Sequence, residues 1–548
     1  MKIGICQINT TVGDFAGNRR RIEEGARHAH QQGAQLAVFP ELALCGYPPE
    51  DLLLKVAFVE AHDRCLAELA DNLPPDLPVL VGCLARNDQR DQGGRPLHNA
   101  VALVEDGLAR VVSHKCLLPT YDIFDESRFF EPWTKPELSL VELGGKRIGV
   151  LVCEDGWNDE EFFTSRRYAL DPVEKVVAAG ADLVINLSAS PWALGREEFR
   201  YRMLRAASQR HGVPIVYVNL VGGNVALQFD GASMAVKPEG LAFQPIHFDE
   251  CTKVVDTDVP WEEVPRFSPA EAMHQSALAQ GVRDYCSKFG FSRCVVGLSG
   301  GIDSAVTAAL AVDAIGSENV VGISMPSTFS SEHSVEDAKA LANNLGMDLH
   351  SLAISPLQAA YSDVLKPMFH DTERSVAEEN LQARMRGALL MAYANKFDHL
   401  LLTTGNKSET AVGYCTLYGD MCGGLAVIAD LWKTEVYTLA RWLNRNGERI
   451  PQSTIDKPPS AELRPGQRDT DALPPYDVLD PILKLLVEDE MGAELVAQRL
   501  GADQGLVSRL ANMVQGSEFK RFQYAPTLRV SLRCWVGRRV PVSHRFRE

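Results

Sequence analysis

Short apolar runs alternate with helix-forming segments along the second half of this chain, and this alternation restricts the fold more than any other feature. The expected strands are 294–298, 319–325, 349–354 and 399–403. The expected helices are about 304–315, 333–345, 375–397 and 433–446. Strands that alternate with helices form parallel sheets whose ligands bind at the carboxyl ends of the strands. The second half is therefore predicted to be a doubly wound parallel sheet.

The first half has a second set of apolar runs, separated in several places by amphipathic helices. The expected strands lie near 2–9, 35–42, 78–85, 97–105, 147–153, 182–188 and 215–221. The clearest helices are "NRRRIEEGARHAHQQG" and "REEFRYRMLRAASQRHG". A chain of 548 residues exceeds what one hydrophobic core usually supports. We therefore predict a layered α/β domain over 1–255, a proline-containing linker over 256–270 and a second domain over 271–548.

The charge balance and the cysteines narrow the possible partners. Asp and Glu number 72 against 55 Lys and Arg, which gives a formal charge of −17. This excess argues against a general nucleic-acid or anionic-membrane surface. The 12 cysteines form no Cys-x-x-Cys pair and have no His partners at zinc spacing. With no signal-peptide core in "MKIGICQINTT" and no apolar run of bilayer length, we expect a reduced, cytoplasmic protein.

The stretch "CVVGLSGGIDSAVTAAL", residues 294–310, joins an expected strand to an expected helix through a glycine-containing turn. Such turns hold phosphates, because free backbone N–H groups and the helix dipole point at the ligand. The turn lacks the Gly-Lys-Ser/Thr of a Walker loop, and it lacks the Gly-x-Gly-x-x-Gly dinucleotide pattern. By spacing alone, Ser299, Gly300, Gly301, Asp303 and Ser304 fit a phosphate cradle and a helix-capping turn about equally.

This Ser-Gly-Gly-x-Asp-Ser pattern resembles the turn of N-type ATP pyrophosphatases, which grips the β- and γ-phosphates that leave as pyrophosphate. Downstream, "LLTTGNKSETAVGYCTLYGDMCGG" resembles the second signature of NAD synthetases, which amidate the nicotinate carboxylate of deamido-NAD. The implied ATP-binding residues are Leu298, Ser299, Gly300, Gly301, Ile302, Asp303, Ser304, Ala305 and Thr404. The implied deamido-NAD-binding residues are Asn380, Arg384, Glu409, Lys433 and Lys520, with Asp420 nearby.

The same resemblance implies Mg²⁺ at Glu409 and Asp303, since a carboxylate acceptor and ATP repel one another until cations neutralise the α-phosphate. Taken singly, Glu409 equally suits a solvated loop acid, and Lys433 and Lys520 suit surface lysines. Their order and context favour the functional interpretation.

Three residues of the first half form a set that can cleave an amide. Glu41 lies in "AVFPELALCGYPPEDLL", Lys115 in "SHKCLLPTYDIFDESRFF" and Cys153 in "RIGVLVCEDGWN". A nucleophile, a base and a cation are what amide cleavage through a thioester requires. Cys153 would attack the glutamine side-chain carbonyl, Glu41 would take the thiol proton, and Lys115 would stabilise the oxyanion. A lone cysteine at a strand end, however, is more often buried and inert.

The words "FPEL", "HK" with "LPTY", and "CED", in this order, resemble the nitrilase superfamily and specifically the glutaminase domain of glutamine-dependent NAD synthetases. The implied fold is an αββα sandwich. The resemblance assigns Glu126 to orienting the triad, and Tyr121, Ser190 and Arg196 to the glutamine pocket. Arg196 alone would equally suit a helix residue paired with Glu197 or Glu198.

The resemblance covers nearly the whole chain and implies a glutamine-dependent NAD synthetase that uses deamido-NAD, ATP and glutamine. The products would be NAD, AMP, pyrophosphate and glutamate. Two alternatives stay open: another ATP-pyrophosphatase amidotransferase, such as a GMP or asparagine synthetase, and a nucleotide-binding regulatory protein with an inert nitrilase half. A homo-oligomer is expected, although the sequence gives no subunit number. The segment 451–476 is where lid residues are expected, but its contacts cannot be assigned from the sequence.

Overall fold

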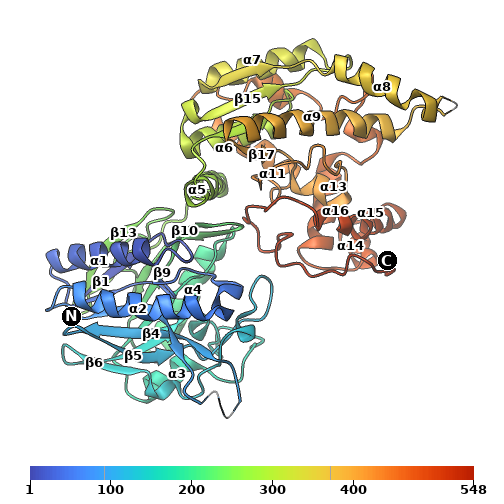
Figure 1. Ribbon diagram of the computed structural model, residues 1–548. Helices are drawn as coiled ribbons and strands as arrows, with labels where there is room; N and C mark the ends of the chain where they lie inside the picture. The colour runs from blue at the N-terminus through green and yellow to red at the C-terminus, as the bar shows by residue number, and fades with distance from the viewer. Residues whose placement is uncertain (90, 92, 371, 548) are drawn as a thin grey trace. The chain divides into compact units, whose positions relative to one another are not determined.

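The computed structural model describes residues 1–548 except 90, 92, 371 and 548, and these residues form two compact units (Figure 1). Unit 1 is Met1–Ser268 and unit 2 is Pro269–Glu548. The predicted linker at 256–270 and the domain boundaries derived from it stay predictions. Among the described residues, no helix combines the length and the apolar character needed to cross a bilayer.

Unit 1 contains two sheets that pack face to face. The first has the order β13 (Cys251–Asp256), β1 (Lys2–Gln7), β2 (Leu36–Val38), β3 (Val79–Arg86), β4 (Leu97–Glu105) and β5 (Leu108–His114). The second has the order β12 (Met234–Val236), β9 (Ile215–Asn219), β8 (Leu183–Ser188), β7 (Lys146–Val152) and β6 (Leu140–Leu143). A separate hairpin pairs β10 (Val221–Asn224) with β11 (Leu227–Asp230).

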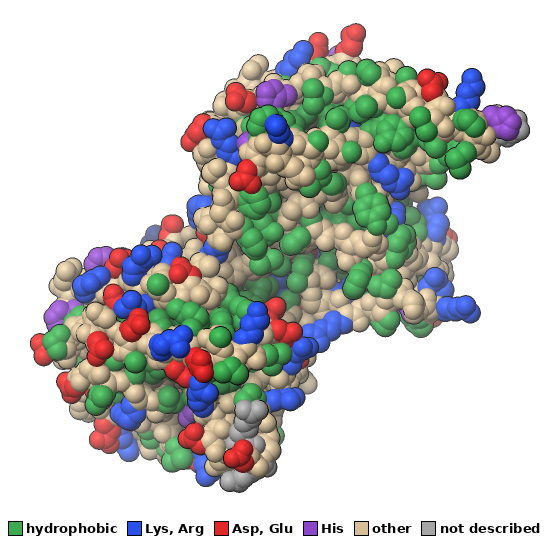
Figure 2. Space-filling view, viewed as in Figure 1, with side chains coloured by type: hydrophobic (Ala, Val, Ile, Leu, Met, Phe, Trp, Pro, Cys, Tyr) green, Lys and Arg blue, Asp and Glu red, His purple; other side chains and the backbone are tan. Residues whose placement is uncertain are grey.

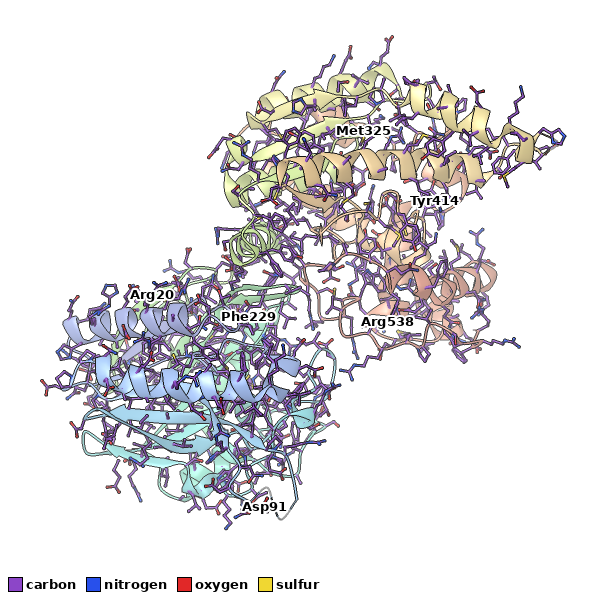
Figure 3. All side chains as sticks on the ribbon, in the orientation of Figure 1. Arg20, Asp91, Phe229, Met325, Tyr414 and Arg538 are labelled. Carbon is purple, nitrogen blue, oxygen red and sulfur yellow. The ribbon has the colours of Figure 1, made fainter. Side chains whose placement is uncertain are left out.

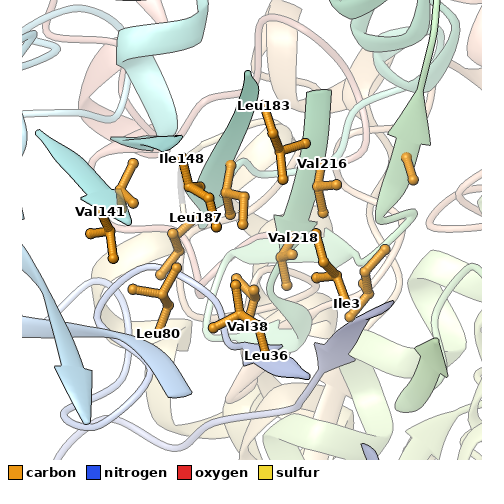
Figure 4. Close-up of a cluster of buried hydrophobic side chains, with 14 of the residues drawn as sticks. Ile3, Leu36, Val38, Leu80, Val141, Ile148, Leu183, Leu187, Val216 and Val218 are labelled. Atoms are coloured by element: carbon orange, nitrogen blue, oxygen red, sulfur yellow. The ribbon is translucent and has the colours of Figure 1, made fainter. Parts of the chain in front are cut away.

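The core of unit 1 lies between the two sheets (Figure 4). Residues such as Val38 and Leu80 from the first sheet pack against Leu187 and Val216 from the second. Successive strand residues point to opposite faces, so Val150 enters this core while Leu151 points to the helices outside. Helices α1 (Phe15–Gln31) and α2 (Val56–Asn72) cover the first sheet. Helices α3 (Pro172–Ala178) and α4 (Arg196–His211) cover the second, and the predicted αββα sandwich is confirmed.

Unit 2 contains a parallel sheet with helices on it. The strand order is β16 (Asp348–Ser351), β15 (Val320–Ser324), β14 (Cys294–Gly297), β17 (Leu400–Thr403) and β18 (Leu425–Ala426). The principal helices are α5 (Ala270–Phe289), α6 (Ile302–Ile315), α7 (Glu332–Leu345), α8 (Ser355–Phe369), α9 (Val376–Phe397) and α11 (Lys433–Leu443). The four predicted strands and the four predicted helices of this half are present, with ends shifted by up to three residues.

The strand order of unit 2 determines where a ligand can bind. The chain proceeds from β14 outward to β15 and β16, and then returns to pair β17 with the opposite edge of β14. This reversal creates a crevice at the carboxyl ends of β14 and β17, the usual ligand position in doubly wound sheets. The Ser-Gly-Gly turn follows β14, and Thr404 follows β17.

A helical cluster that the sequence analysis did not predict completes unit 2. It comprises α10 (Lys407–Val412), α13 (Tyr476–Val487), α14 (Ala493–Leu500), α15 (Gln504–Gly516) and α16 (Glu518–Arg521). A further short helix, α12 (Gln452–Asp456), contacts α6, α7 and α11 instead. Buried side chains of α13, α14 and α15 pack together around Leu479, Val496 and Leu510. Val412 of α10 belongs to the same apolar cluster, so this packing holds the "GNKSE" segment in place.

Candidate active sites in the two units

Lys115 is the centre of a buried charge cluster in unit 1. Its Nζ atom lies 2.7 Å from Glu41 Oε1 and 2.9 Å from Glu126 Oε1, and 1% of its side chain is exposed. Glu41 follows β2, Lys115 follows β5, and Glu126 begins a short 3₁₀ helix, Glu126–Arg128. Burial by itself would lower the pKa of Lys115, but the Glu126 and Glu41 carboxylates outweigh it and raise that pKa. Lys115 therefore keeps its positive charge inside the protein.

Both carboxylates beside Lys115 are held by further hydrogen bonds. Asn99 Nδ2 donates to Glu41 Oε1 at 2.6 Å, and the Ala189 backbone N–H donates to Glu41 Oε2 at 2.9 Å. The Tyr47 hydroxyl donates to Glu126 Oε1 at 2.9 Å. The segment of Glu41, after β2, also needs a glycine neighbour, because a Cβ at Gly82 would lie 2.3 Å from the Leu42 nitrogen. These contacts leave Glu41 one orientation.

Cys153 stands at the end of β7, on a turn that forces an unusual backbone conformation. It has φ +44°, it begins the 3₁₀ helix Cys153–Gly156, and Asn186 Nδ2 donates to its carbonyl at 3.1 Å. A non-glycine residue at positive φ is strained, and such residues persist where the surrounding structure holds them. Burial first, and Glu41 second, raise the pKa of the Cys153 thiol, whereas Lys115 lowers it. The nucleophile predicted from the sequence is thus a protonated thiol at neutral pH.

Asp155 connects the cysteine turn to the lysine segment. Its Oδ1 atom accepts from the Cys116 and Leu117 backbone N–H groups at 2.9 and 2.8 Å, and its Oδ2 accepts from Val152 N–H at 3.1 Å. The side chain is fully buried. Cys116 and Leu117 directly follow Lys115, and Val152 directly precedes Cys153. Asp155 therefore fixes the lysine segment and the cysteine segment relative to each other. The sequence analysis did not single it out.

The residues predicted for the glutamine pocket lie on three separate segments. The Tyr121 hydroxyl donates to Glu154 Oε1 at 3.0 Å. The Ser190 backbone N–H donates to Asn219 Oδ1 at 2.8 Å, which fixes the loop after β8. Arg196 is the first residue of α4, and its guanidinium lies 5.3 Å from the centre of the Trp157 ring.

Glu154 is a buried acid that sequence reasoning missed, although it stands next to Cys153 in the quoted "CED". Tyr168 as well as Tyr121 donates its hydroxyl to Glu154 Oε1, in each case at 3.0 Å. Burial raises the pKa of Glu154 in spite of Lys115 and these two hydroxyls. Glu197, one of the two acids that could pair with Arg196, has its Oε1 2.8 Å from His247 Nε2.

Unit 2 contains a cavity of about 280 Å³ at the carboxyl ends of β14, β15 and β17. Met325 and Tyr414, labelled in Figure 3, both line it. The predicted residues that line it are Leu298, Ser299, Gly301, Ile302, Asp303, Ser304, Thr404, Glu409 and Lys433, with Asp420 beside them. The sequence-predicted ATP turn, Thr404 and Glu409 therefore meet at one cavity although up to 111 positions separate them.

The glycine turn is open toward this cavity. Gly301 N–H donates to Ser299 Oγ at 3.2 Å, and Ser304 Oγ donates to the Gly301 carbonyl at 2.9 Å. Helix α6 begins at Ile302, and no side chain caps it at Gly301. Gly300 has φ +76°, and a Cβ there would lie 2.3 Å from the Ser334 carbonyl oxygen of α7. The turn thus requires glycine at 300, where two backbone segments touch.

Lys433 and two acids form a charged group in the cavity. Lys433 Nζ is ion-paired with Asp303 and lies 3.6 Å from Glu409 Oε1. Asn406 Nδ2 donates to Asp303 Oδ1 at 3.0 Å, and Asn406 Oδ1 accepts from Glu409 N–H at 3.0 Å, which caps α10. Burial, and then the nearby Asp303, raise the pKa of Glu409 to about 8. Within the part of the chain that the structure describes, no cluster of three or more His, Cys, Asp or Glu side chains could hold a metal ion.

Three predicted acceptor residues contact one loop instead of lining the cavity. Asn380 Oδ1 accepts from Thr416 Oγ1 at 2.8 Å, and Arg384 Nε donates to the Leu417 carbonyl at 3.2 Å. Lys520 Nζ donates to the Gly413 and Cys415 carbonyls, both at 2.7 Å. Gly300 and Ala305 also lie outside the cavity lining. The binding roles of these five residues stay predictions.

Several charged residues of the cavity were not found from the sequence. Arg386, Lys457, Glu462 and Asp469 line it. Arg386 Nε donates to the Met325 carbonyl at 3.1 Å, and Lys457 Nζ donates to Glu462 Oε1 at 2.8 Å. Lys457 and Glu462 belong to the proline-rich segment 451–476, which has no hydrophobic period from which its position could be predicted.

Comparison with known proteins identifies the family. A carbon-nitrogen hydrolase family model matches residues 2–264, and an NAD synthase model matches residues 274–524. The glutamine-dependent NAD(+) synthetase of Synechocystis is 48% identical over 99% of both chains. The chain belongs to the glutamine-dependent NAD(+) synthetase family.

Other members of the glutamine-dependent NAD(+) synthetase family are similar over the same length. The Thermotoga maritima protein is 39% identical over 100% of this chain and 99% of its own. The solved Acinetobacter baumannii synthetase, in complex with ADP, is 34% identical with a TM-score of 0.75, covering 99% of this chain and 98% of that one. The Cytophaga hutchinsonii structure has a TM-score of 0.83 at 22% identity over 99% and 97% of the two chains, a likeness of fold alone.

Charged side chains of both signs are mixed on the drawn face of the molecule. On the face shown in Figure 2, acidic and basic side chains are interspersed over both units. In each candidate site, by contrast, a buried lysine is paired with carboxylates: Lys115 with Glu41 in unit 1 and Lys433 with Asp303 in unit 2.

Proposed function

We propose that this enzyme amidates deamido-NAD to NAD with ammonia from glutamine, cleaving ATP to AMP and pyrophosphate. Membership of the glutamine-dependent NAD(+) synthetase family supports this activity. One observation carries the proposal: the buried Glu41–Lys115 pair beside Cys153 is complete in a chain whose second unit places a Ser-Gly-Gly turn in a cavity. An inert nitrilase half has no reason to keep a buried charge pair, which costs desolvation energy.

In unit 1, Cys153 is the proposed nucleophile and Glu41 its base. Because the thiol is protonated at neutral pH, it needs a base during attack, and Glu41 is held in one orientation by Lys115, Asn99 and Ala189. The sulfur bonds to the side-chain carbonyl carbon of glutamine while Glu41 takes the proton. The amide nitrogen receives that proton and leaves as ammonia. Water activated by Glu41 then cleaves the thioester to glutamate.

Lys115 and Glu126 complete the proposed glutaminase. The fixed charge of Lys115 stabilises the oxyanion that forms on the glutamine carbonyl, and Glu126 orients that ammonium group. Tyr121, Ser190 and Arg196 are proposed to bind glutamine. Arg196 would bind its α-carboxylate, since a guanidinium matches a carboxylate with two parallel hydrogen bonds.

In unit 2, the deamido-NAD carboxylate is proposed to attack the α-phosphate of ATP. The open turn at Ser299–Ser304 holds the phosphates that leave as pyrophosphate, and Thr404 contacts the nucleotide. The Acinetobacter baumannii relative was solved in complex with ADP, which supports an adenine nucleotide as a ligand of this enzyme. Ammonia then attacks the nicotinate carbonyl carbon of the adenylate, and AMP leaves. Asn380, Arg384, Lys433 and Lys520 are proposed to bind deamido-NAD.

The acids of unit 2 fit a magnesium ion that is shared with phosphates. Mg²⁺ in nucleotide sites is usually bound by one or two carboxylates together with phosphate oxygens. Asp303 and Glu409 supply two carboxylates, and burial first and the nearby Asp303 second raise the pKa of Glu409. We therefore propose Asp303 and Glu409 as the residues that would hold Mg²⁺. When bound, the ion would neutralise charge on the phosphates.

The cellular location and the oligomeric state of the protein are also proposals. The cytoplasmic location predicted from the cysteines is supported by 12 cysteines that are all free thiols. A homo-oligomer is supported by α8, which has exposed apolar residues on one stripe: Leu357, Tyr361, Val364 and Met368. Residues spaced three and four apart share one helix face, so a second copy could cover them.

An acceptor screen tests the proposed function. The full-length protein receives ATP, Mg²⁺ and glutamine, and deamido-NAD, XMP or aspartate is added in turn while AMP is measured. AMP that forms only with deamido-NAD supports the proposal. AMP with XMP or aspartate would favour the other amidotransferases, and no AMP with any acceptor would favour a regulatory protein.

A further inference from the structure

Lys457 is a cation in the cavity of unit 2 that the proposed reaction has not yet used. It follows α12 and lines the same cavity as Ser299, Gly301 and Ser304. Its Nζ atom is hydrogen-bonded to Ser334 Oγ and lies 2.8 Å from Glu462 Oε1. Ser334 is also the residue whose backbone touches Gly300. Ser334 therefore lies between Lys457 and the turn that is proposed to hold the ATP phosphates.

Glu462 keeps this lysine neutralised. Its carboxylate accepts from Lys457 Nζ, from Ser334 Oγ at 2.7 Å and from Ser331 Oγ at 3.1 Å. Burial would raise the pKa of Glu462, but the hydrogen bonds from Lys457 and Ser334 outweigh it and lower that pKa. Glu462 is thus a carboxylate anion beside a site proposed for phosphate anions. Like charges in one cavity repel each other. A phosphate bound there therefore favours movement of the Glu462 carboxylate away from the site.

The backbone around Glu462 allows such a departure. Glu462 has φ +47°, a left-handed conformation that is unfavourable for a residue with a Cβ. Between α12 and the 3₁₀ helix Asp469–Asp471, the described residues form no helix or strand. The strained conformation is held by the carboxylate contacts, so the segment relaxes when the carboxylate leaves.

We infer that Lys457 is a further substrate-binding residue. Once Glu462 has released Lys457, the ammonium group of this lysine binds the ATP phosphate groups that later leave as pyrophosphate. The inference rests on the proposed function for the identity of the ligand. Arg386, which lines the same cavity, adds positive charge on this side. Lysine suits the role because its ammonium group is a compact point charge that follows a moving phosphate.

Calorimetric titration of the full-length protein with inorganic pyrophosphate and Mg²⁺ tests this inference. Lys457→Met should weaken binding by roughly tenfold or more, the scale of one lost charge-assisted hydrogen bond. Glu462→Gln should tighten pyrophosphate binding by roughly two- to fivefold, because the Lys457–Glu462 ion pair no longer has to be broken before Lys457 binds the ligand. The control is Arg464→Met on the same segment, whose side chain is 48% exposed and pairs with Asp471. It should bind as the parent does.

The opposite signs of the two effects separate this role from a structural one. If Glu462→Gln weakens pyrophosphate binding as Lys457→Met does, the pair only stabilises the segment and the inference is wrong. Parental binding by Lys457→Met, or no binding by the parent, also overturns it. The double variant Lys457→Met/Glu462→Gln leaves no unpaired charge, and it should bind as weakly as Lys457→Met alone. The titration needs no turnover, so a failed acceptor screen would refute the proposed function without deciding this result.

Discussion

Replacing Gly300 with alanine tests how the phosphate turn of unit 2 is built. Gly300 has φ +76°, and a Cβ added there would lie 2.3 Å from the Ser334 carbonyl oxygen and 2.7 Å from Ser334 Cα. Real Cβ atoms essentially never approach closer than 3.0 Å. The obstructing atoms are backbone, which cannot swing away as a side chain can. The substitution must therefore separate the turn from α7 or distort one of them.

Two separate costs determine the expected magnitude. A left-handed conformation costs a non-glycine residue about 1–2 kcal/mol, and forcing extra volume into a packed site adds about 1–3 kcal/mol. The total for Gly300→Ala is about 2–5 kcal/mol of local stability. Gly290→Ala isolates the first cost, because Gly290 has φ +83° and a Cβ there meets nothing within 4 Å. It should lose only about 1–2 kcal/mol.

Hydrogen exchange measures this difference at the turn itself. In the full-length protein, amides of residues 294–315 should lose more protection in Gly300→Ala than amides near residue 290 lose in Gly290→Ala. Gly301→Val is the functional comparison, because Gly301 has φ −94° and its nearest obstruction is the Ser299 side chain at 3.2 Å. It should retain protection while the calorimetric affinity for ATP falls. Equal loss of protection in Gly300→Ala and Gly290→Ala would refute the steric reasoning, and unchanged ATP binding by Gly301→Val would favour a simple capping turn.

Three further substitutions test the charged groups. Glu409→Gln should lower AMP formation by roughly 10²-fold, the scale of one lost electrostatic group, while glutamate release from glutamine stays at the parental rate. Lys115→Met leaves two buried carboxylates without their cation, and amide exchange in unit 1 should show a loss of about 3–5 kcal/mol. His114 has its pKa lowered to about 4, mainly by burial and then by His98. Since the unfolded imidazole binds its proton near 6.5, stability is lost as the pH falls from 6.5 to 4, by about 1–3 kcal/mol. His114→Asn should lack this part of the acid destabilisation when urea midpoints at pH 7 and pH 4.5 are compared.

Each of these three predictions has a result that contradicts it. Parental AMP formation by Glu409→Gln would make Glu409 a structural acid of the α10 cap. Unchanged protection in Lys115→Met would mean that the two carboxylates are protonated or hydrated without the lysine. An equal drop of the urea midpoint in the parent and in His114→Asn would assign the acid sensitivity to other groups.

The parts of the fold that the sequence predicts best are those with strong local patterns. Apolar runs bounded by turns predicted β14, β15 and β17, because a strand buried on both faces has few polar positions. The edge strand β16 is mostly exposed, and the expected strand 349–354 covers only part of it. Strands β5, β6, β10, β11, β12, β13 and β18 were not predicted. Five of them, β6, β10, β11, β12 and β18, have only two to four residues, too few for a period, and pairing with their neighbours makes them strands. The longer β5 and β13 are edge strands with few buried residues and without an apolar run.

The candidate sites divide in the same way. Glu41, Lys115 and Cys153 could be predicted because each lies in a quoted motif at a strand end, and strand ends of one sandwich meet. Asp155 could not, since its role consists of accepting backbone N–H groups from a segment 38 and 39 residues away. Lys457 and Glu462 escaped detection because a proline-rich loop is positioned by tertiary contacts alone.

Cys153→Ala tests most directly whether the two chemistries are separate. The substitution removes one sulfur from a residue that is 8% exposed, so the rest of both units should stay folded. NAD formation is measured in the variant and the parent, once with glutamine and once with ammonium chloride at mildly alkaline pH. Loss of the nucleophile should lower the glutamine-dependent rate by several orders of magnitude.

We predict a split result for Cys153→Ala: no NAD formation with glutamine, and NAD formation near the parental rate with ammonium chloride. Free ammonia can then reach the adenylate without the glutaminase. Continued use of glutamine by the variant would show that Cys153 is not the nucleophile. Failure of the folded variant with both nitrogen donors would contradict the central claim that unit 1 only supplies ammonia to unit 2.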